Sequence, residues 1–166
     1  LEFRRVLFRS YFVGVPGTPG AALTLESKQQ PVAEIPFAST QPALAVAGFP
    51  YTTYRVTTPI QQIAWETRVT PASGNPNLAV RRERVPNEFN NDAYSETDAG
   101  VADSITLVPP TLSDGVFYLT VYSDGAHRFS LFNGEPEITD RPYIGATVNA
   151  PPHTSRNGWR YYRLTD

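Results

Sequence analysis

Apolar and polar side chains alternate along several short stretches of the chain, and a period of two predicts β-strands. In residues 53–57, Tyr54 and Val56 alternate with threonine and arginine, as in a strand with one buried and one solvated face. The same alternation in residues 63–69 places on one face the side chains of Ile63, Trp65, Thr67 and Val69. Trp65 is therefore predicted to be a core residue.

Four further strands are predicted downstream, at residues 78–80, 104–107, 117–122 and 128–132. A turn rich in Ser, Gly, Asn and Pro precedes the first of them, and Asp124-Gly125 predicts a two-residue hairpin between the last two. Two segments lack large aliphatic periodicity and are predicted to be a long surface loop (86–103) and a proline-rich connector (136–157). Short strands separated by polar turns predict an all-β fold, a jelly-roll-like antiparallel β-sandwich.

Two segments near the beginning of the chain recur near its end. Residues 51–57 (YTTYRVT) reappear as residues 159–165 (WRYYRLT) at an offset of 108. Residues 11–37 align without a gap on residues 117–143 at an offset of 106, with apolar residues at alternate positions in both. Identical pairs are few, so the prediction of a true repeat rests on the shared period of two. The alternative is a chance likeness between two unrelated β segments.

We therefore predict a fragment of a tandem array of sandwiches. The predicted organisation is the C-terminal strands of a preceding repeat plus a linker (11–48), one near-complete sandwich (49–143), and a proline-rich linker with the first strand of the next repeat (144–166). Without its partner strands, the segment 158–166 is expected to be poorly packed or to pair with the strands within residues 11–26.

Residues 1–10 (LEFRRVLFRS) do not join the strand pattern and resemble the translation of a sequencing adapter. We exclude them from fold reasoning as an artefact of a metagenomic fragment. The alternative interpretation is a basic amphipathic arm. If the adapter interpretation is correct, the natural N-terminus, with any signal peptide, precedes this sequence.

Composition excludes several classes of function. The chain of 166 residues has no Cys and no Met, which rules out a disulfide framework and thiolate chemistry. A net charge of −2 and a single lysine, Lys28, argue against nucleic-acid binding, which needs clustered positive charge. The basic run at residues 81–84 is predicted to be the solvated end of a strand. No apolar stretch has the length of a membrane-spanning helix.

The order of four motifs resembles the bacterial pre-peptidase C-terminal domain over residues 49–132. The motifs are YRV at 54–56, SGNPNLAV at 73–80, DSITL at 103–107 and GVFYLTV at 115–121. The resemblance implies a small jelly-roll-like sandwich without catalytic machinery, appended to secreted peptidases and other exported proteins, sometimes in several copies. The chain departs from the family at Asn75 and Asn77, where acidic residues are common, and at Ala79, where an aromatic is usual.

The sequence contains few candidates for chemistry. His127 and His153 are the only histidines, and no Gly-x-Ser-x-Gly motif accompanies them, so we expect ordinary surface residues and no catalytic site. Four carboxylates in or beside the long loop could bind Ca²⁺ as a structural ion, which collagen-binding relatives of the family use: Asp92, Glu96, Asp98 and Asp103. The alternative is a solvated loop, and only a calcium site would make the melting temperature sensitive to EDTA.

Aromatic residues suggest the remaining candidate site. Tyr118 and Tyr122 lie on the opposite face of their strand from Phe117, Leu119 and Val121, and could form a platform that stacks on sugar rings. Packing against a second layer or a neighbouring repeat is the other interpretation. We expect a non-catalytic sandwich repeat of a large secreted or cell-surface bacterial protein, acting as a spacer, adhesion or enzyme-appended accessory module. The alternative is a module that binds polysaccharide or an extracellular matrix protein.

Overall fold

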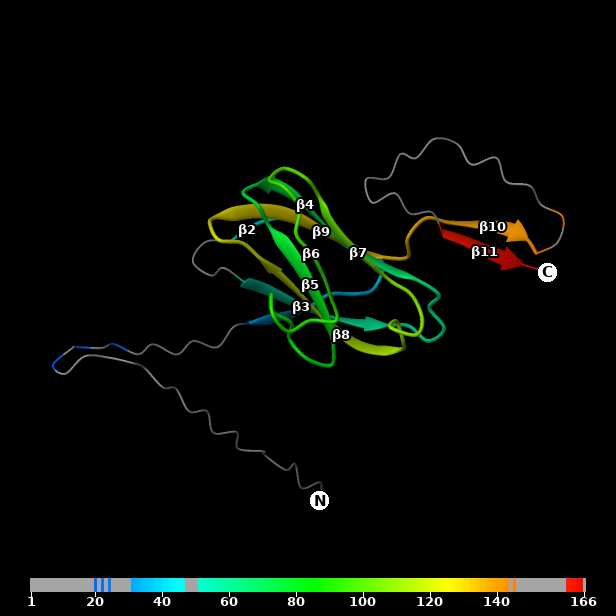
Figure 1. Ribbon diagram of the computed structural model, residues 1–166, viewed down its shortest axis with the longest axis horizontal. Helices are drawn as coiled ribbons and strands as arrows, with labels where there is room; N and C mark the ends of the chain where they lie inside the picture. Colours follow the sequence, from blue (N-terminus) through cyan, green and yellow to red (C-terminus); the bar gives the residue numbers. More distant parts are fainter. Residues whose placement is uncertain are drawn as a thin grey trace, which may run out of the picture.

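The computed structural model describes residues 20, 22, 24, 31–46, 51–143, 145 and 161–165, without the side chains of residues 43–46. Nine strands of this part form two facing sheets, and two more form a separate pair (Figure 1). One sheet has the order β1-β3-β8-β5-β6 and the other the order β2-β9-β4-β7. The strands are β1 (Val32–Glu34), β2 (Ser39–Val46), β3 (Tyr51–Thr58), β4 (Trp65–Ser73), β5 (Asn77–Arg82), β6 (Ala93–Ser95), β7 (Asp103–Leu107), β8 (Gly115–Tyr122), β9 (His127–Gly134), β10 (Ile138–Pro142) and β11 (Tyr161–Thr165). The predicted all-β sandwich is confirmed. Except for the parallel pair β1–β3, the pairings within the two sheets are antiparallel.

The core lies between the sheets and is formed by the alternate apolar positions of their strands. The predicted assignment of Trp65 to the core is confirmed, because its side chain is fully buried. Its indole ring packs against the ring of Phe117, with 5.1 Å between centroids and 56° between planes. Phe117, Leu119 and Val121 of β8 and Phe129 and Leu131 of β9 are also fully buried. Ile63, predicted on the same face as Trp65, is exposed instead, because β4 begins only at Trp65.

The predicted domain boundary at residue 49 is wrong. Strands β1 and β2, which the sequence assigned to a preceding repeat and a linker, belong to the same two sheets as the rest of the sandwich. Strand β1 pairs with β3, and β2 pairs with β9 along most of its length. Each therefore supplies hydrogen bonds to a strand edge that would otherwise lack a partner. The sandwich spans residues 32–134.

Two contacts fix the chain between β1 and β2 to the sandwich. Ile35 is buried in the core, and its amide donates a hydrogen bond of 3.0 Å to the carbonyl of Arg55. Asn133 of β9 is fully buried, and its Nδ2 donates to the carbonyl of Pro36 at 3.0 Å and to Oγ of Ser39 at 2.9 Å. This segment is thus an integral part of the unit.

The predicted Asp124-Gly125 hairpin is a crossing between the two sheets. Strands β8 and β9, on either side of it, lie in different sheets and do not pair. The turn from β4 to β5 also crosses, and the two turns pack closely. At Gly74, where φ is +74°, a Cβ would lie 2.7 Å from the carbonyl oxygen of Ala126 and 2.9 Å from Cβ of His127. Glycine at this position therefore satisfies both the backbone conformation and the close approach.

Two segments predicted to lack strands contain one each. Residues 86–103 include the short edge strand β6, which pairs with β5, and end at the first residue of β7. The proline-rich connector includes β10, which pairs in parallel with β11 apart from the sandwich (Figure 1). The side chains of Tyr162, Arg163, Leu164 and Thr165 in β11 are exposed, in line with the expected poor packing of this segment.

Several predictions concern residues outside the described part. These are the adapter-like residues 1–10, nearly all of residues 11–30, and most of 144–160 with His153. Residues 159 and 160 of the recurring motif are among them. The proposed pairing of 158–166 with 11–26 also involves them, although β11 has β10 as its partner. Within the part of the chain that the structure describes, no helical segment has the length and apolarity needed to cross a bilayer.

Candidate functional site

The outer face of the five-stranded sheet gathers the polar and aromatic side chains of its central strands. Directly opposed residues of antiparallel strands project to the same face. Tyr118 of β8 lies between Arg55 of β3 and Arg81 of β5 in this register. Thr53 and Ala79 flank Thr120 in the same way, so the middle of the face is built from small side chains. All three are buried, and Thr53 and Thr120 lie within 3.2 Å of each other at their hydroxyl oxygens.

The two tyrosines of the predicted platform share an orientation but differ in exposure. Tyr118 and Tyr122 both project away from the core, as expected, because Phe117, Leu119 and Val121 project into it. Tyr118 is half-buried and remains partly accessible. Tyr122 is buried, which contradicts its assignment to a surface platform. Its ring lies against that of Tyr51, with 6.3 Å between centroids, and so serves packing.

The loop between β6 and β7 covers Tyr122. The hydroxyl of Tyr122 donates a hydrogen bond of 2.6 Å to Oε1 of Glu96. Burial raises the pKa of the Tyr122 hydroxyl, and the carboxylate of Glu96 raises it further because it accepts a hydrogen bond from the neutral hydroxyl and would repel a phenolate. Tyr122 therefore stays protonated as a donor that fastens the loop to the sheet.

Asp103, the first residue of β7, is fully buried beside the same loop. Ser95 Oγ donates a hydrogen bond of 2.6 Å to its Oδ1. Burial raises the pKa of the Asp103 carboxyl, and hydrogen bonds from Ser95 and Thr97 oppose this shift by favouring the charged form. The net shift is upward, so the folded protein binds this proton more tightly than the unfolded chain does.

Substitution of Asp103 by Asn will remove a pH dependence from stability. A pKa raised on folding stabilises the folded state below the unfolded value of about 3.9, and the contribution is lost as pH rises through the higher folded value. The difference in unfolding free energy between wild type and Asp103→Asn should therefore shift against wild type across that interval. Urea titrations of both proteins from pH 3.5 to 7 measure it. A difference that is constant with pH would contradict the assignment.

The four predicted calcium ligands do not converge. Among the described residues, no group of three acidic or histidine side chains is placed to hold a metal ion. Asp103 is engaged by Ser95, Glu96 accepts from Tyr122, and the side chain of Asp98 is exposed. Asp92 also has a structural partner, since its Oδ2 accepts a hydrogen bond of 2.8 Å from the backbone N–H of Arg82.

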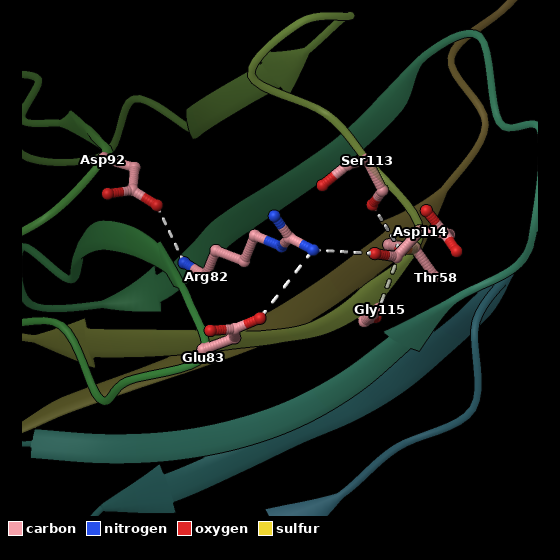
Figure 2. A network of polar contacts seen from close by, with 7 residues as sticks. All are labelled: Thr58, Arg82, Glu83, Asp92, Ser113, Asp114 and Gly115. Atoms are coloured by element: carbon pink, nitrogen blue, oxygen red, sulfur yellow. Dashed lines mark hydrogen bonds and ion pairs between the residues drawn. The ribbon is translucent and has the colours of Figure 1, made fainter.

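Arg82 belongs to a network that ties strand ends together (Figure 2). Its Nη2 donates to the carbonyl of Asp114 at 3.3 Å and lies 3.7 Å from Oε1 of Glu83. Close by, Thr58 Oγ1 contacts the carbonyls of Ser113 and Gly115 at 3.0 and 3.1 Å. The network joins the ends of β3 and β5 to the start of β8, which accounts for these polar groups structurally. The predicted solvated strand end at residues 81–84 is confirmed, because β5 ends at Arg82 and the next two residues are exposed.

His127 is not a surface residue, contrary to the prediction. Its side chain is buried at the start of β9, its Nδ1 lies 3.0 Å from the carbonyl of Gly125, and its ring stacks on Phe129 at 5.6 Å. The imidazole therefore stabilises the crossing turn between the sheets. None of the hydrogen bonds or ion pairs found for it joins it to a carboxylate or a serine.

Sequence reasoning missed two highly exposed aromatic side chains near the edge strand β6. Phe89 is 90% exposed, and Tyr94 of the edge strand β6 is 61% exposed. The turn that presents Phe89 is braced by Asn87, whose Oδ1 accepts from the amides of Phe89 and Asn90 at 3.0 and 2.8 Å. Tyr94 pairs with Ala79 and so lies on the same outer face as Tyr118. The Asn-Glu-Phe-Asn-Asn run was the available signal, because asparagines favour tight turns.

The fold has a counterpart among solved structures. The pre-peptidase C-terminal domain of collagenase from Bacillus anthracis superimposes with a TM-score of 0.52 and 14% sequence identity, over 65% of this chain and 99% of that domain. The sandwich has the fold of a pre-peptidase C-terminal domain. The resemblance noted in the sequence motifs is thereby supported at the level of the fold.

A second solved structure is more distant. The periplasmic inhibitor of g-type lysozyme from Aeromonas hydrophila gives a TM-score of 0.40 and 17% identity, over 61% of this chain and 95% of that protein. Neither a protein-family model nor a curated protein sequence matches the chain.

Proposed function

We propose that this chain is a non-catalytic β-sandwich module of a large secreted or cell-surface bacterial protein. It acts as a structural spacer, as an adhesion module or as an accessory module appended to an enzyme. The observation that carries the proposal is the fold, which matches nearly the whole length of a domain found in a collagenase. The engagement of Asp92, Glu96 and Asp103 in hydrogen bonds that hold loops and strand ends also supports it.

A second candidate is the binding of polysaccharide or an extracellular matrix protein. The observation that favours it is the partly accessible Tyr118 between two arginines, with the exposed Tyr94 on the same face. Tyrosine rings stack on sugars, and arginine and tyrosine are enriched where proteins bind one another. This face would be the contact surface, and Tyr122, held by Glu96 and the ring of Tyr51, would take no direct part in binding.

Retention on insoluble ligands separates a spacer or enzyme-appended module from a module that binds polysaccharide or matrix protein. We expect the chain to pass through cellulose, chitin and collagen resins unretained, as a spacer or enzyme-appended module would. Retention that is lost in Tyr118→Ala and Tyr94→Ala, but kept in Ile60→Ala, would instead assign the outer face to ligand binding. Ile60 is a matched control because it is 76% exposed and lies in the β3–β4 connection. Circular dichroism of each variant verifies that the sandwich remains folded.

A further inference from the structure

The pair β10–β11 reproduces the pair β1–β3 of the sandwich. Both pairs are parallel, and both join strands that are far apart in sequence. In the first pair Glu34 lies opposite Arg55, with 2.6 Å between Oε1 and Nη1. In the second, Asp140 lies opposite Arg163, with 2.7 Å between Oδ1 and Nε. The same charge pair thus occupies the same place in both.

The registers of the two pairs coincide residue for residue. Residues 32–34 correspond to 138–140 at the offset of 106, and residues 53–55 correspond to 161–163 at the offset of 108. The structure pairs 32–34 with 53–55, and it pairs 138–140 with 161–163, each in the same order. A shift of one residue would place opposite faces together, so a shared register is a specific feature. The recurring sequence motifs and the strand registers are therefore two independent observations that relate β10–β11 to β1–β3.

Positions that form the core in the first pair are exposed in the second. Tyr54 is 2% exposed and Val56 is fully buried, whereas the corresponding Tyr162 and Leu164 are 40% and 59% exposed. Strand β3 has β8 on its other edge, but no described strand pairs with the other edge of β11. A two-stranded sheet with apolar side chains and an open edge is marginally stable by itself.

We propose that β10 and β11 are the β1 and β3 strands of a second sandwich, and that the open edge of β11 receives the β8 strand of that sandwich in the same polypeptide. The expected occupant is an antiparallel strand of the Gly-x-Phe-Tyr-Leu-x-Val type, which covers the equivalent edge of β3. Tyr162 and Leu164 then enter a second core. This inference rests on the proposed role as a repeated module and adds the joint between modules.

The joint between the two units is short. Strand β9 ends at Gly134 and β10 begins at Ile138, so only residues 135–137 separate the last strand of one sandwich from the first strand of the next. Pro136 in this connection is buried, and proline restricts the backbone. Successive sandwiches would therefore be joined by a short connection, which suits a spacer.

A chain extended by a second copy of residues 58–134 directly after Thr165 tests the proposal. Because Thr165 corresponds to Thr57, this extension supplies the counterparts of β4–β9 in register. In chain order, the counterpart of β2 falls between β10 and β11. We expect amide hydrogen exchange in residues 161–165 to slow by about 100-fold or more relative to the 166-residue chain, toward the rates of residues 53–57. We also expect the extended protein to remain monomeric.

Two variants of the extended chain serve as a matched pair. Leu164→Asp places a charge at the position equivalent to the buried Val56 and should abolish the protection, while Arg163→Gln on the other face should retain it. Fast exchange in residues 161–165 of the extended chain, or its precipitation, would overturn the proposal. So would dimerisation that protects these residues without the extension, because the edge would then belong to a second molecule. None of these three results would bear on the proposed non-catalytic function.

Discussion

A chain cut to residues 49–143 will lose most of its stability, whereas residues 31–143 will unfold cooperatively like the intact chain. The shorter cut removes β1 and β2, leaves edges of β3 and β9 unpaired, and takes Ile35 out of the core. Removing one large aliphatic side chain from a core costs about 2–5 kcal/mol, and unpaired strands add to this. Because domains of this size are stable by only about 5–15 kcal/mol, we expect the shorter chain to be largely unfolded.

Circular dichroism during urea and thermal unfolding measures the difference between the two cuts. Asn133→Ala in residues 31–143 is an informative intermediate, because it removes only the hydrogen bonds from Asn133 to Pro36 and Ser39. It should destabilise less than the deletion does. If residues 49–143 unfold at the same urea concentration as residues 31–143, the first two strands do not belong to the folding unit.

Replacement of Trp65 by Ala will be the most damaging single substitution in the core, costing about 3–5 kcal/mol of unfolding free energy. The indole is fully buried and packs against Phe117, so its removal leaves a cavity between the two sheets. Trp65→Phe should cost much less, since it keeps an aromatic ring and gives up an indole N–H that has no hydrogen-bond partner. Urea unfolding followed by circular dichroism gives both values.

Phe89→Ala is the control for loss of an aromatic side chain. Phe89 is 90% exposed, so its removal should change the unfolding free energy by less than about 0.5 kcal/mol. A large effect of Phe89→Ala, or a small effect of Trp65→Ala, would mean that the sheets face each other differently from the arrangement described above.

Sequence and structure agree most closely at the recurring motifs. Alternation predicted β3, β4, β5, β7, β8 and β9, and the two offsets aligned β1 with β10 and β3 with β11. The assignment of β1 to a preceding unit is wrong because β1 pairs with β3 of the same sandwich. A strand's sequence reports which of its faces is buried, but it does not report which neighbouring strand completes its hydrogen bonds.

The burial of the polar candidate site residues was another feature that the sequence did not reveal. Asp103, Tyr122 and His127 are polar side chains at the ends of strands, where exposure is the usual expectation, yet all three are buried. The loop over Tyr122 and the crossing turns that enclose His127 exist only once the two sheets face each other. Candidate sites that depended on their exposure could therefore not be judged from the sequence.

Side-chain alternation is a local property of a strand, so the all-β class and the core positions of the central strands could be predicted from the sequence. Three features emerge only in the three-dimensional structure: the limits of the folding unit, the crossing between sheets at Asp124-Gly125, and the matched registers of β1–β3 and β10–β11. These depend on hydrogen bonds and packing between segments far apart in the chain, which no local pattern encodes.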